Sequence, residues 1–218
     1  MSVPNEYRIP KLPREEWTDE AREVFAFWGE PNAWDEGSKT NIIMVLAQHP
    51  KLAMVYSQWG KHFLMENSLN TRQQEIVILR IAYLVRSEYE WHNHVGYGVN
   101  AGLTLDQIAA IRDFPNGATF NEEETALLRA CDELKANNNV SDETWASLSQ
   151  HFTRHQLMDL VFMAGHYLMT SWALKAFGVP LEGGADAIGF DLATKSGSTP
   201  GATYKPGETE DWIATRGY

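Results

Sequence analysis

The chain has 218 residues, of which 44% are hydrophobic, and its formal net charge is −11. This apolar content is enough for a folded core, so it excludes a chain that is disordered throughout. A nucleic acid or an anionic membrane surface would need a basic face, and the sequence has no long run of Lys or Arg. We therefore expect neither a nucleic acid nor a membrane as a partner.

The single cysteine, Cys131, lies in the apolar stretch 126–131. One thiol cannot form an internal disulfide, and its apolar neighbours favour a small buried hydrophobe over a catalytic thiol. The first eight residues lack the apolar core of a signal peptide. The apolar run 157–177 contains Asp159, His166 and Lys175, which favours a buried helix over a membrane span. A cytoplasmic location is the resulting expectation.

The first half of the chain begins with an extended lead, residues 1–12, which contains two prolines. A first helix is expected from Pro13 and Arg14 to Trp28, followed by a loop to Lys39. Apolar residues then recur at helical spacing in 41–48 and 51–65. No alternation of period two is sustained between residues 40 and 177, so we predict an all-α fold of about eight or nine helices.

Helix starts are predicted by a Thr or Asn that is followed three residues later by Gln or Glu, the pattern of a capping box. We assign four such pairs to helix starts: Thr71 with Gln74, Thr104 with Gln107, Asn121 with Glu124, and Thr153 with Gln156. The segment 76–82 is rich in β-branched residues and could form a buried strand. Its length and the preceding cap favour a helix.

The composition changes after Pro180, because residues 182–218 are rich in glycine and still carry aromatic side chains. This favours an arm, residues 181–218, that packs over its own subunit or a neighbour rather than a solvated tail. The predicted organisation is a lead over 1–12, one helical domain over 13–180, and the arm.

The most informative stretch is residues 87–94, which places two carboxylates and two imidazoles close together. Ser87, Glu90 and His94 share one helix face, because spacings of three and four bring side chains together. Glu88 and His92 form a second pair, which we expect at the surface. A Glu beside a His can move its pKa toward neutrality, so the first face predicts an acid–base site.

This stretch carries a family resemblance. Together with Thr71-Arg72-Gln73-Gln74-Glu75 and the exit Ala101-Gly102-Leu103-Thr104, it resembles the carboxymuconolactone decarboxylase family, which includes the alkylhydroperoxidase D-like proteins. The resemblance implies a multi-helix orthogonal bundle of the alkylhydroperoxidase D-like type, here with an extended C-terminal arm. It also implies a homo-oligomer, a trimer or hexamer, that acts on a small-molecule substrate.

The resemblance separates two branches of the family. The peroxidase branch carries Cys-x-x-Cys-x-x-x-His, and its two cysteines fall on Ser87 and Glu90, its His on His94 and its upstream acid on Glu75. Thiol-based peroxide reduction needs a thiolate and a resolving partner, so a thiol peroxidase is disfavoured. The form Glu90-Trp91-x-x-His94 is more similar to the decarboxylase branch, which implies a lyase that uses no metal or organic cofactor.

In this interpretation His94 is the general acid/base, Glu90 is its partner, and Glu75 is a second carboxylate that orients His94 or shuttles a proton. Ser87 also fits a helix N-cap better than a nucleophile. An anionic substrate would need Arg80 or Arg86 near the site. The candidate substrate-binding residues are Ser87, Tyr89, Trp91, Arg86 and His166.

Other chemistries were weighed on the same residues. No His-Glu-x-x-His motif, dinucleotide fingerprint or P-loop occurs, so we expect no metal site, although Glu75, Glu90 and His94 could hold one divalent ion. The same Glu/His pair could serve an isomerase, a dehydratase or a lactone hydrolase. A non-catalytic oligomeric binding protein with this fold is the remaining alternative.

Overall fold

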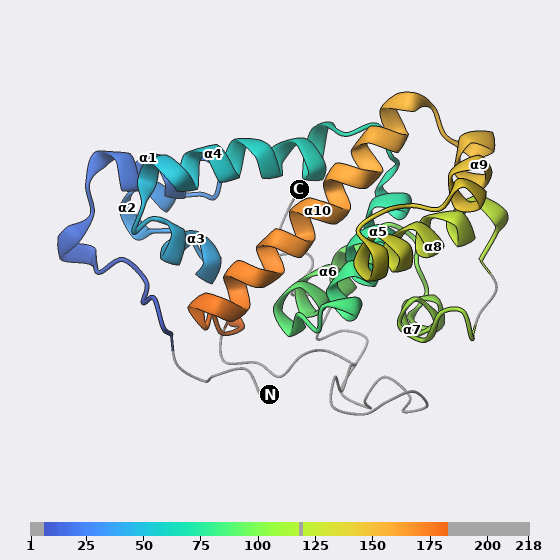
Figure 1. Cartoon of the computed structure of the whole chain (residues 1–218). Helices are drawn as coiled ribbons and strands as arrows, with labels where there is room; N and C mark the ends of the chain where they lie inside the picture. The colour runs from blue at the N-terminus through green and yellow to red at the C-terminus, as the bar shows by residue number, and fades with distance from the viewer. Residues whose placement is uncertain (1–6, 118–119, 183–218) are drawn as a thin grey trace. The chain divides into compact units, whose positions relative to one another are not determined.

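The computed structural model describes residues 7–117 and 120–182, and these form helices and loops without a strand (Figure 1). The all-α prediction is confirmed. Contacts divide the described residues into two compact units: unit 1 has residues 7–67 and 172–182, and unit 2 has 68–117 and 120–171. The predicted domain limits, 13–180, stay a prediction. Residues 1–6 of the lead and 183–218 of the arm lie outside the described residues.

Unit 1 is made of short helices. They are the 3-10 turn η1 (Arg14–Glu16), α1 (Asp19–Ala26), α2 (Ala33–Glu36), α3 (Asn41–Leu46) and α4 (Pro50–Lys61), which continues into the π-helical turn η2 (His62–Glu66). The prediction of one helix from Pro13 to Trp28 is wrong. Thr18 has extended backbone and its hydroxyl accepts a hydrogen bond from Ala21 N at 3.3 Å, so the α-helix starts only after this cap.

Unit 2 is built around α5 (Thr71–Leu84), which packs against α6 (Glu88–Asn100), α7 (Leu105–Asp113) and α8 (Glu122–Asn137). α9 (Asp142–His151) packs on α8, and α10 (Arg154–Phe177) begins in unit 2. Every residue of α5 from Gln73 to Ala82 is buried, and a helix pairs all of these buried backbone groups internally. The segment 76–82 is therefore helical, as predicted. No described helix is long and apolar enough to span a bilayer.

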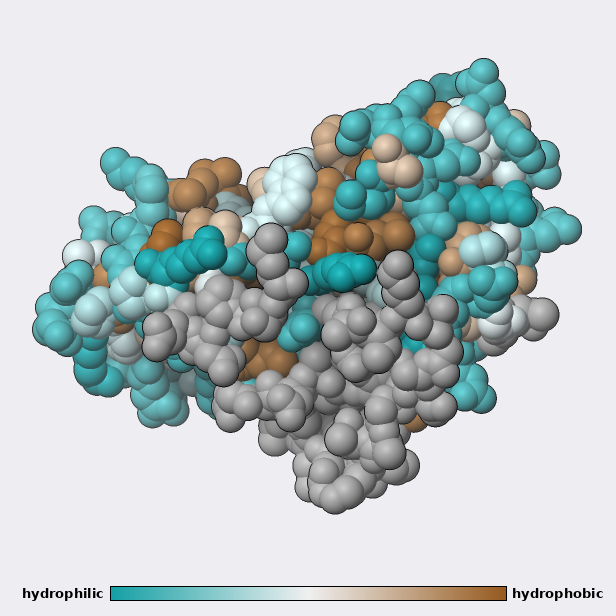
Figure 2. Space-filling model, turned by 60° about the horizontal axis from the view of Figure 1, so that its bottom comes forward, coloured by the Kyte–Doolittle hydropathy of each residue, from teal (hydrophilic) through white to brown (hydrophobic). Residues whose placement is uncertain are grey.

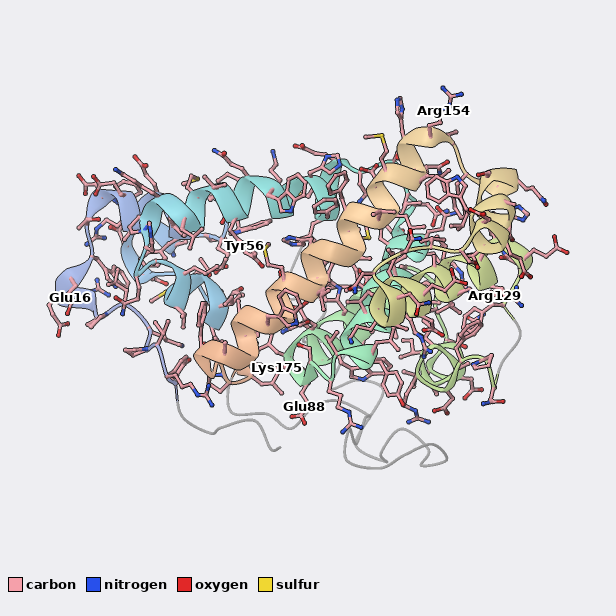
Figure 3. All side chains as sticks on the ribbon, viewed as in Figure 1. Glu16, Tyr56, Glu88, Arg129, Arg154 and Lys175 are labelled. Carbon is pink, nitrogen blue, oxygen red and sulfur yellow. The ribbon has the colours of Figure 1, made fainter. Side chains whose placement is uncertain are left out.

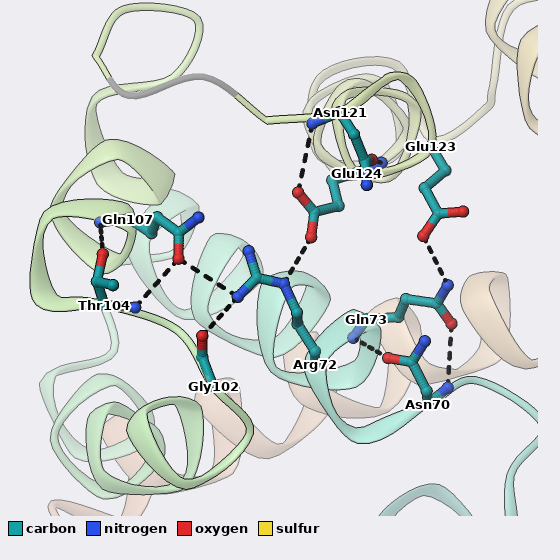
Figure 4. Close-up of polar contacts among 9 residues, drawn as sticks. All are labelled: Asn70, Arg72, Gln73, Gly102, Thr104, Gln107, Asn121, Glu123 and Glu124. Carbon is teal, nitrogen blue, oxygen red and sulfur yellow. Dashed lines mark hydrogen bonds and ion pairs between the residues drawn. The ribbon is translucent and has the colours of Figure 1, made fainter.

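Three capping boxes meet at one arginine in unit 2 (Figure 4). The boxes are Asn70 with Gln73 on α5, Thr104 with Gln107 on α7, and Asn121 with Glu124 on α8. Arg72 Nε donates to Glu124 Oε1 at 2.7 Å, and Nη1 donates to Gln107 Oε1 at 3.3 Å. Nη1 also donates to the carbonyl of Gly102 at 2.7 Å. One guanidinium thus joins the N-terminal ends of three helices.

The capping predictions hold at three of four helices. Thr153 N donates to Gln156 Oε1 at 2.9 Å, and the boxes at Thr104 and Asn121 also form as predicted. The prediction for α5 is wrong by one residue, because Asn70 Oδ1 rather than a Thr hydroxyl accepts the hydrogen bond from Gln73 N, at 2.9 Å. Gln74 instead donates from Nε2 to the carbonyl of Leu69 at 2.7 Å.

Candidate active site

The turn between α5 and α6 sets the direction of α6, the helix that carries Glu90 and His94. Arg86 N donates to the Tyr83 carbonyl at 3.0 Å, and Ser87 N donates to the Ala82 carbonyl at 2.8 Å. This pair of bonds is the Schellman arrangement, in which the residue after the C-cap has left-handed backbone. Arg86 is that residue, with φ of 55°. The turn leaves Ser87 at the N-cap of α6.

The centre of the site is His94, whose two ring nitrogens face two carboxylates. Nδ1 lies 2.9 Å from Glu75 Oε2, and Nε2 lies 3.5 Å from Glu90 Oε2. Glu75 is on α5 and Glu90 is one turn before His94 on α6, so the contacts between α5 and α6 bring the three groups together. All three are buried, with exposed fractions of 5–6%. Sequence spacing indicated Glu90 as the partner; Glu75 is the closer of the two.

The electrostatics of this cluster favour the protonated imidazole. Burial alone would lower the pKa of His94, because it penalises the charged ring. The charge and hydrogen bond of Glu75, with the charge of Glu90, outweigh burial and raise the pKa above its usual value. In the protonated ring, Nδ1 is held by Glu75 and Nε2 faces Glu90.

Aromatic rings surround the imidazole. The ring of Tyr97 on α6 and that of Tyr167 on α10 meet His94 edge to face, with centroids 5.2 Å and 5.1 Å away. Tyr167 also contacts the ring of His166, at 5.1 Å. Burial, and then the charge of His94, lower the pKa of His166 to about 4. Two neighbouring imidazoles thus have pKa values displaced in opposite directions, a pattern seen where acid and base roles are divided.

The remaining predicted residues fall into different surroundings. Ser87 is 1% exposed, and although it occupies the N-cap position, its side chain makes no capping hydrogen bond. Tyr89 and Trp91 are buried, and the Trp91 ring meets that of Tyr83 at 6.4 Å. Arg86 is exposed. Ser87 is thus buried at the start of α6, on the helix face that spacing shares with Glu90 and His94, and Arg86 lies at the surface.

The predicted surface pair of Glu88 and His92 is wrong, because His92 is buried with an exposed fraction of 6%. Glu88 projects outward from the start of α6 (Figure 3). Nearly the whole of α6 from Tyr89 to Gly96 is buried, so both faces that sequence spacing distinguishes lie inside the protein.

The guanidinium of Arg80 is held by hydrogen bonds to residues outside the site. Its guanidinium donates from Nε to Asp132 Oδ1 at 2.6 Å and from Nη2 to Asp132 Oδ2 at 2.9 Å. The other donors meet the carbonyls of Ile111, Arg112 and Phe114. A guanidinium held on every side supports the packing of α5 against α7 and α8, so its role here is structural.

Within the part of the chain that the structure describes, neither a reactive thiol nor a preformed metal site accompanies this cluster. Cys131 is fully buried, and burial, with the charge of Asp132, raises its pKa to about 12. This is an inert core thiol, as predicted. Among the described residues, no group of three or more His, Cys, Asp or Glu side chains is arranged to hold a metal ion.

Sequence reasoning missed Tyr97 and Tyr167 as neighbours of His94. Tyr97 lies three residues after His94 on α6, so helical spacing could have placed it beside the ring. Tyr167 lies on α10, far along the chain, and nothing local in the sequence indicates its contact with His94.

The family comparison agrees with the resemblance seen in the sequence. Residues 51–133 match a model described as the Carboxymuconolactone decarboxylase family. This range contains α5, α6 and α7, hence Glu75, Glu90 and His94. The predicted resemblance is therefore confirmed over this part of the chain. A search of curated protein sequences finds no match.

Solved structures share the fold at low sequence identity. An uncharacterized peroxidase-related protein from Ralstonia eutropha JMP134, described as an alkylhydroperoxidase AhpD core, is 14% identical with a TM-score of 0.68, over 81% of this chain and 93% of that one. The debrominase Bmp8 in complex with 2,3,4-tribromopyrrole is 13% identical with a TM-score of 0.66, over 83% and 94%. These similarities confirm the predicted alkylhydroperoxidase D-like fold.

Proposed function

From the match of residues 51–133 to the carboxymuconolactone decarboxylase family, we propose that this chain is an enzyme that transfers a proton at a carbon atom of a small molecule. The observation that carries the proposal is the buried imidazole of His94 between two carboxylates. A buried, oriented imidazole with a displaced pKa is the usual form of a general acid.

The roles of the three groups follow from their distances. Glu75 accepts the Nδ1 hydrogen of His94 in the shorter contact, at 2.9 Å, so it fixes the ring and favours its charged form. Glu90 faces Nε2 at 3.5 Å, which is longer than a strong charged hydrogen bond. The Nε2 hydrogen is the one that can move to a substrate, with Glu90 as the adjacent carboxylate that receives or returns a proton.

A decarboxylating lyase is the first reaction to test, because the family match includes the whole cluster. In that reaction the bond between the substrate carbon and its carboxylate breaks, carbon dioxide leaves, and the electron pair moves onto a neighbouring carbonyl as an enolate. His94 Nε2–H then donates its proton to the carbon, the carbonyl re-forms, and neutral His94 regains a proton from water. Glu75 holds the ring throughout.

The same proton movement also serves an isomerase, a dehydratase or a lactone hydrolase. These are favoured by the charge of the cluster, since two carboxylates around one imidazolium sum to −1 and repel an anionic substrate. The debrominase and peroxidase-related structures share the fold, but a thiol mechanism at this site is disfavoured, because Ser87 and Glu90 stand at the thiol positions.

A homo-oligomer, trimer or hexamer, is part of the proposal. Apolar side chains are exposed on α10, where Met158, Phe162 and Met169 follow one helix face, and apolar surface is visible among hydrophilic residues in Figure 2. Exposed apolar surface of this kind marks protein interaction sites. Sedimentation equilibrium would give the mass: a monomer at micromolar concentration contradicts this part of the proposal.

The experiment that tests the reaction measures both products. Carboxylated lactones and β-keto acids are incubated in D₂O, carbon dioxide release is followed, and NMR detects deuterium at the carbon. We expect turnover by the wild type and a fall of about 10²- to 10⁴-fold in His94→Gln. His155→Gln, an exposed histidine on α10, is the matched control and keeps the wild-type rate. Equal rates in His94→Gln and wild type would contradict the proposal.

A further inference from the structure

The hydroxyl of Ser87 is buried, and no group of the described protein forms a hydrogen bond with it. The residue is 1% exposed, and its Oγ has no hydrogen-bond partner among the described residues. Burying a hydroxyl without a partner costs about 1–3 kcal/mol, so such groups are rare unless something else binds them.

The position of Ser87 is fixed by its backbone. Its N–H donates to the Ala82 carbonyl at 2.8 Å, and its carbonyl accepts a hydrogen bond from Trp91 N at 3.0 Å. Both bonds belong to the turn and the first turn of α6. With the backbone fixed, only rotation about χ1 and the O–H bond can move the hydroxyl. Ser87 is therefore a preorganised hydrogen-bond donor.

Ser87 also shares the face of the acid–base cluster. Glu90 lies three residues after it and His94 four residues after that, so the three side chains line one side of α6. A serine at an N-cap usually accepts a hydrogen bond from the backbone of the first turn. Ser87 makes no such bond, so capping does not account for this side chain.

We propose that the Ser87 hydroxyl binds the carbonyl oxygen of the substrate while His94 transfers a proton at the adjacent carbon. This inference rests on the proposed function and names its substrate class: a ketone, ester or lactone that can form an enolate. The bound oxygen is the atom on which negative charge develops when the carbon loses a proton or a carboxyl group.

The step is balanced with the groups present. As the enolate forms, either carbon dioxide leaves or the C–H proton passes to the Glu90 carboxylate beside His94. The electron pair of the broken bond moves into the carbonyl, and the Ser87 O–H donates a hydrogen bond to the oxygen without losing its proton. In the reverse sense the pair returns to carbon, a C–H bond forms with the proton of His94 Nε2, and the carbonyl is restored. Removing one such donor costs about 10²- to 10³-fold in rate in other enzymes.

The test uses the whole chain and needs no knowledge of the natural substrate. NMR in D₂O follows exchange of the hydrogen next to the carbonyl in a panel of cyclic ketones, γ-lactones and β-keto acids. We expect Ser87→Ala to exchange about 10²-fold more slowly than wild type, with a melting temperature that is unchanged or higher, since an unpaired hydroxyl is removed. A purely structural serine would lower the melting temperature instead.

Two further variants keep the result decisive. Ser57→Ala removes an equally buried hydroxyl, on α4, that also has no partner among the described residues, and keeps the wild-type rate. Ser87→Cys preserves the shape with a weaker donor and slows exchange even if Ser87→Ala fails to fold. Wild-type exchange in Ser87→Ala or Ser87→Cys overturns the inference and leaves the proposed function standing. Absence of exchange in the wild type across the panel overturns both.

Discussion

Two polar clusters of unit 2 both include residues of α5, and they differ in kind. The cluster around Arg72 joins three capping boxes, and each of its contacts satisfies a helix end or a loop carbonyl (Figure 4). The cluster around His94 joins three buried ionisable side chains to one another. The first arrangement holds helices together. The second raises the pKa of His94 and places an exchangeable proton on its ring.

The two clusters differ in whether their central side chain can release a proton. The guanidinium of Arg72 carries a permanent charge, so its contacts hold helix ends and offer no proton for chemistry. The imidazole of His94 can gain or lose a proton, and its two carboxylate partners favour the protonated state. Changing a residue of the first cluster should alter stability, and changing one of the second should alter chemistry.

Among changes to the partners of His94 and to the Arg72 cluster, the largest effect is expected from Glu75→Gln. The amide keeps the shape but removes the charge that raises the pKa of His94, so less of the general acid is protonated and the ring is held less firmly. We expect a fall of about 10²- to 10³-fold in the rate of deuterium exchange, with little change in melting temperature. Glu88→Gln, at the outward start of α6, is the control. A large stability loss with normal activity would place Glu75 with the structural cluster.

The converse effect is expected from Arg72→Met. This change leaves Glu124, which is buried, without its ion pair and frees two acceptors at helix ends. We expect the free energy of unfolding to fall by about 2 kcal/mol, measured by urea titration. The exchange rate per folded molecule should stay within about twofold of wild type. A loss of rate without a loss of stability would contradict the division between the clusters.

The stability of the protein should depend on pH through the two histidines of the site, His94 and His166. Since the pKa of His94 is raised in the folded state, its contribution to stability is present below about pH 6.5 and is lost as the pH rises through the folded value. The pKa of His166 is lowered to about 4, so its contribution is present above about pH 6.5 and is lost as the pH falls toward 4. Stability should therefore pass through a maximum.

Activity should follow the same proton on His94. The rate should be constant while His94 is protonated and should fall about tenfold per pH unit above its pKa. In Glu75→Gln the fall should begin at lower pH, whereas in Arg72→Met it should not move. An unchanged profile in Glu75→Gln would mean that another group sets the pH dependence. Rates measured from pH 5 to 9 give the comparison.

The smallest effect is expected from Arg86→Gly. Arg86 has left-handed backbone, with φ of 55°, at a position where glycine carries no steric penalty. We expect the free energy of unfolding to rise by about 0.5–1 kcal/mol, because the strain in the turn is relieved. The KM for an anionic substrate, if one is found, tests the predicted substrate-binding role of Arg86: an unchanged KM removes it from the site.

Local signals account for what the sequence predicted correctly. The helices of unit 2 follow from apolar spacing and from caps, and the shared face of Ser87, Glu90 and His94 follows from spacings of three and four. The contact between Glu75 and His94 was implied by the family resemblance. Spacing alone could not provide it, because it depends on how α5 packs against α6.

The wrong predictions have physical causes. Asn70 and Thr71 are both good N-caps and each has a Gln three residues later, so the sequence is ambiguous and the backbone decides. His92 was expected at the surface because a Glu four residues before a His is common on exposed faces. Its burial reflects packing around nearly all sides of α6, which a helical repeat does not encode.

The most direct test is the titration of the His94 imidazole itself, followed by nitrogen-15 NMR of labelled histidine in wild type, Glu75→Gln and Glu90→Gln. The arrangement predicts a pKa above the usual histidine value of about 6.5 in wild type, a lower value in both variants, and the larger drop in Glu75→Gln. A wild-type pKa at or below about 6.5, or one that neither variant moves, would contradict the claim that two carboxylates hold a protonated imidazole at the centre of this protein.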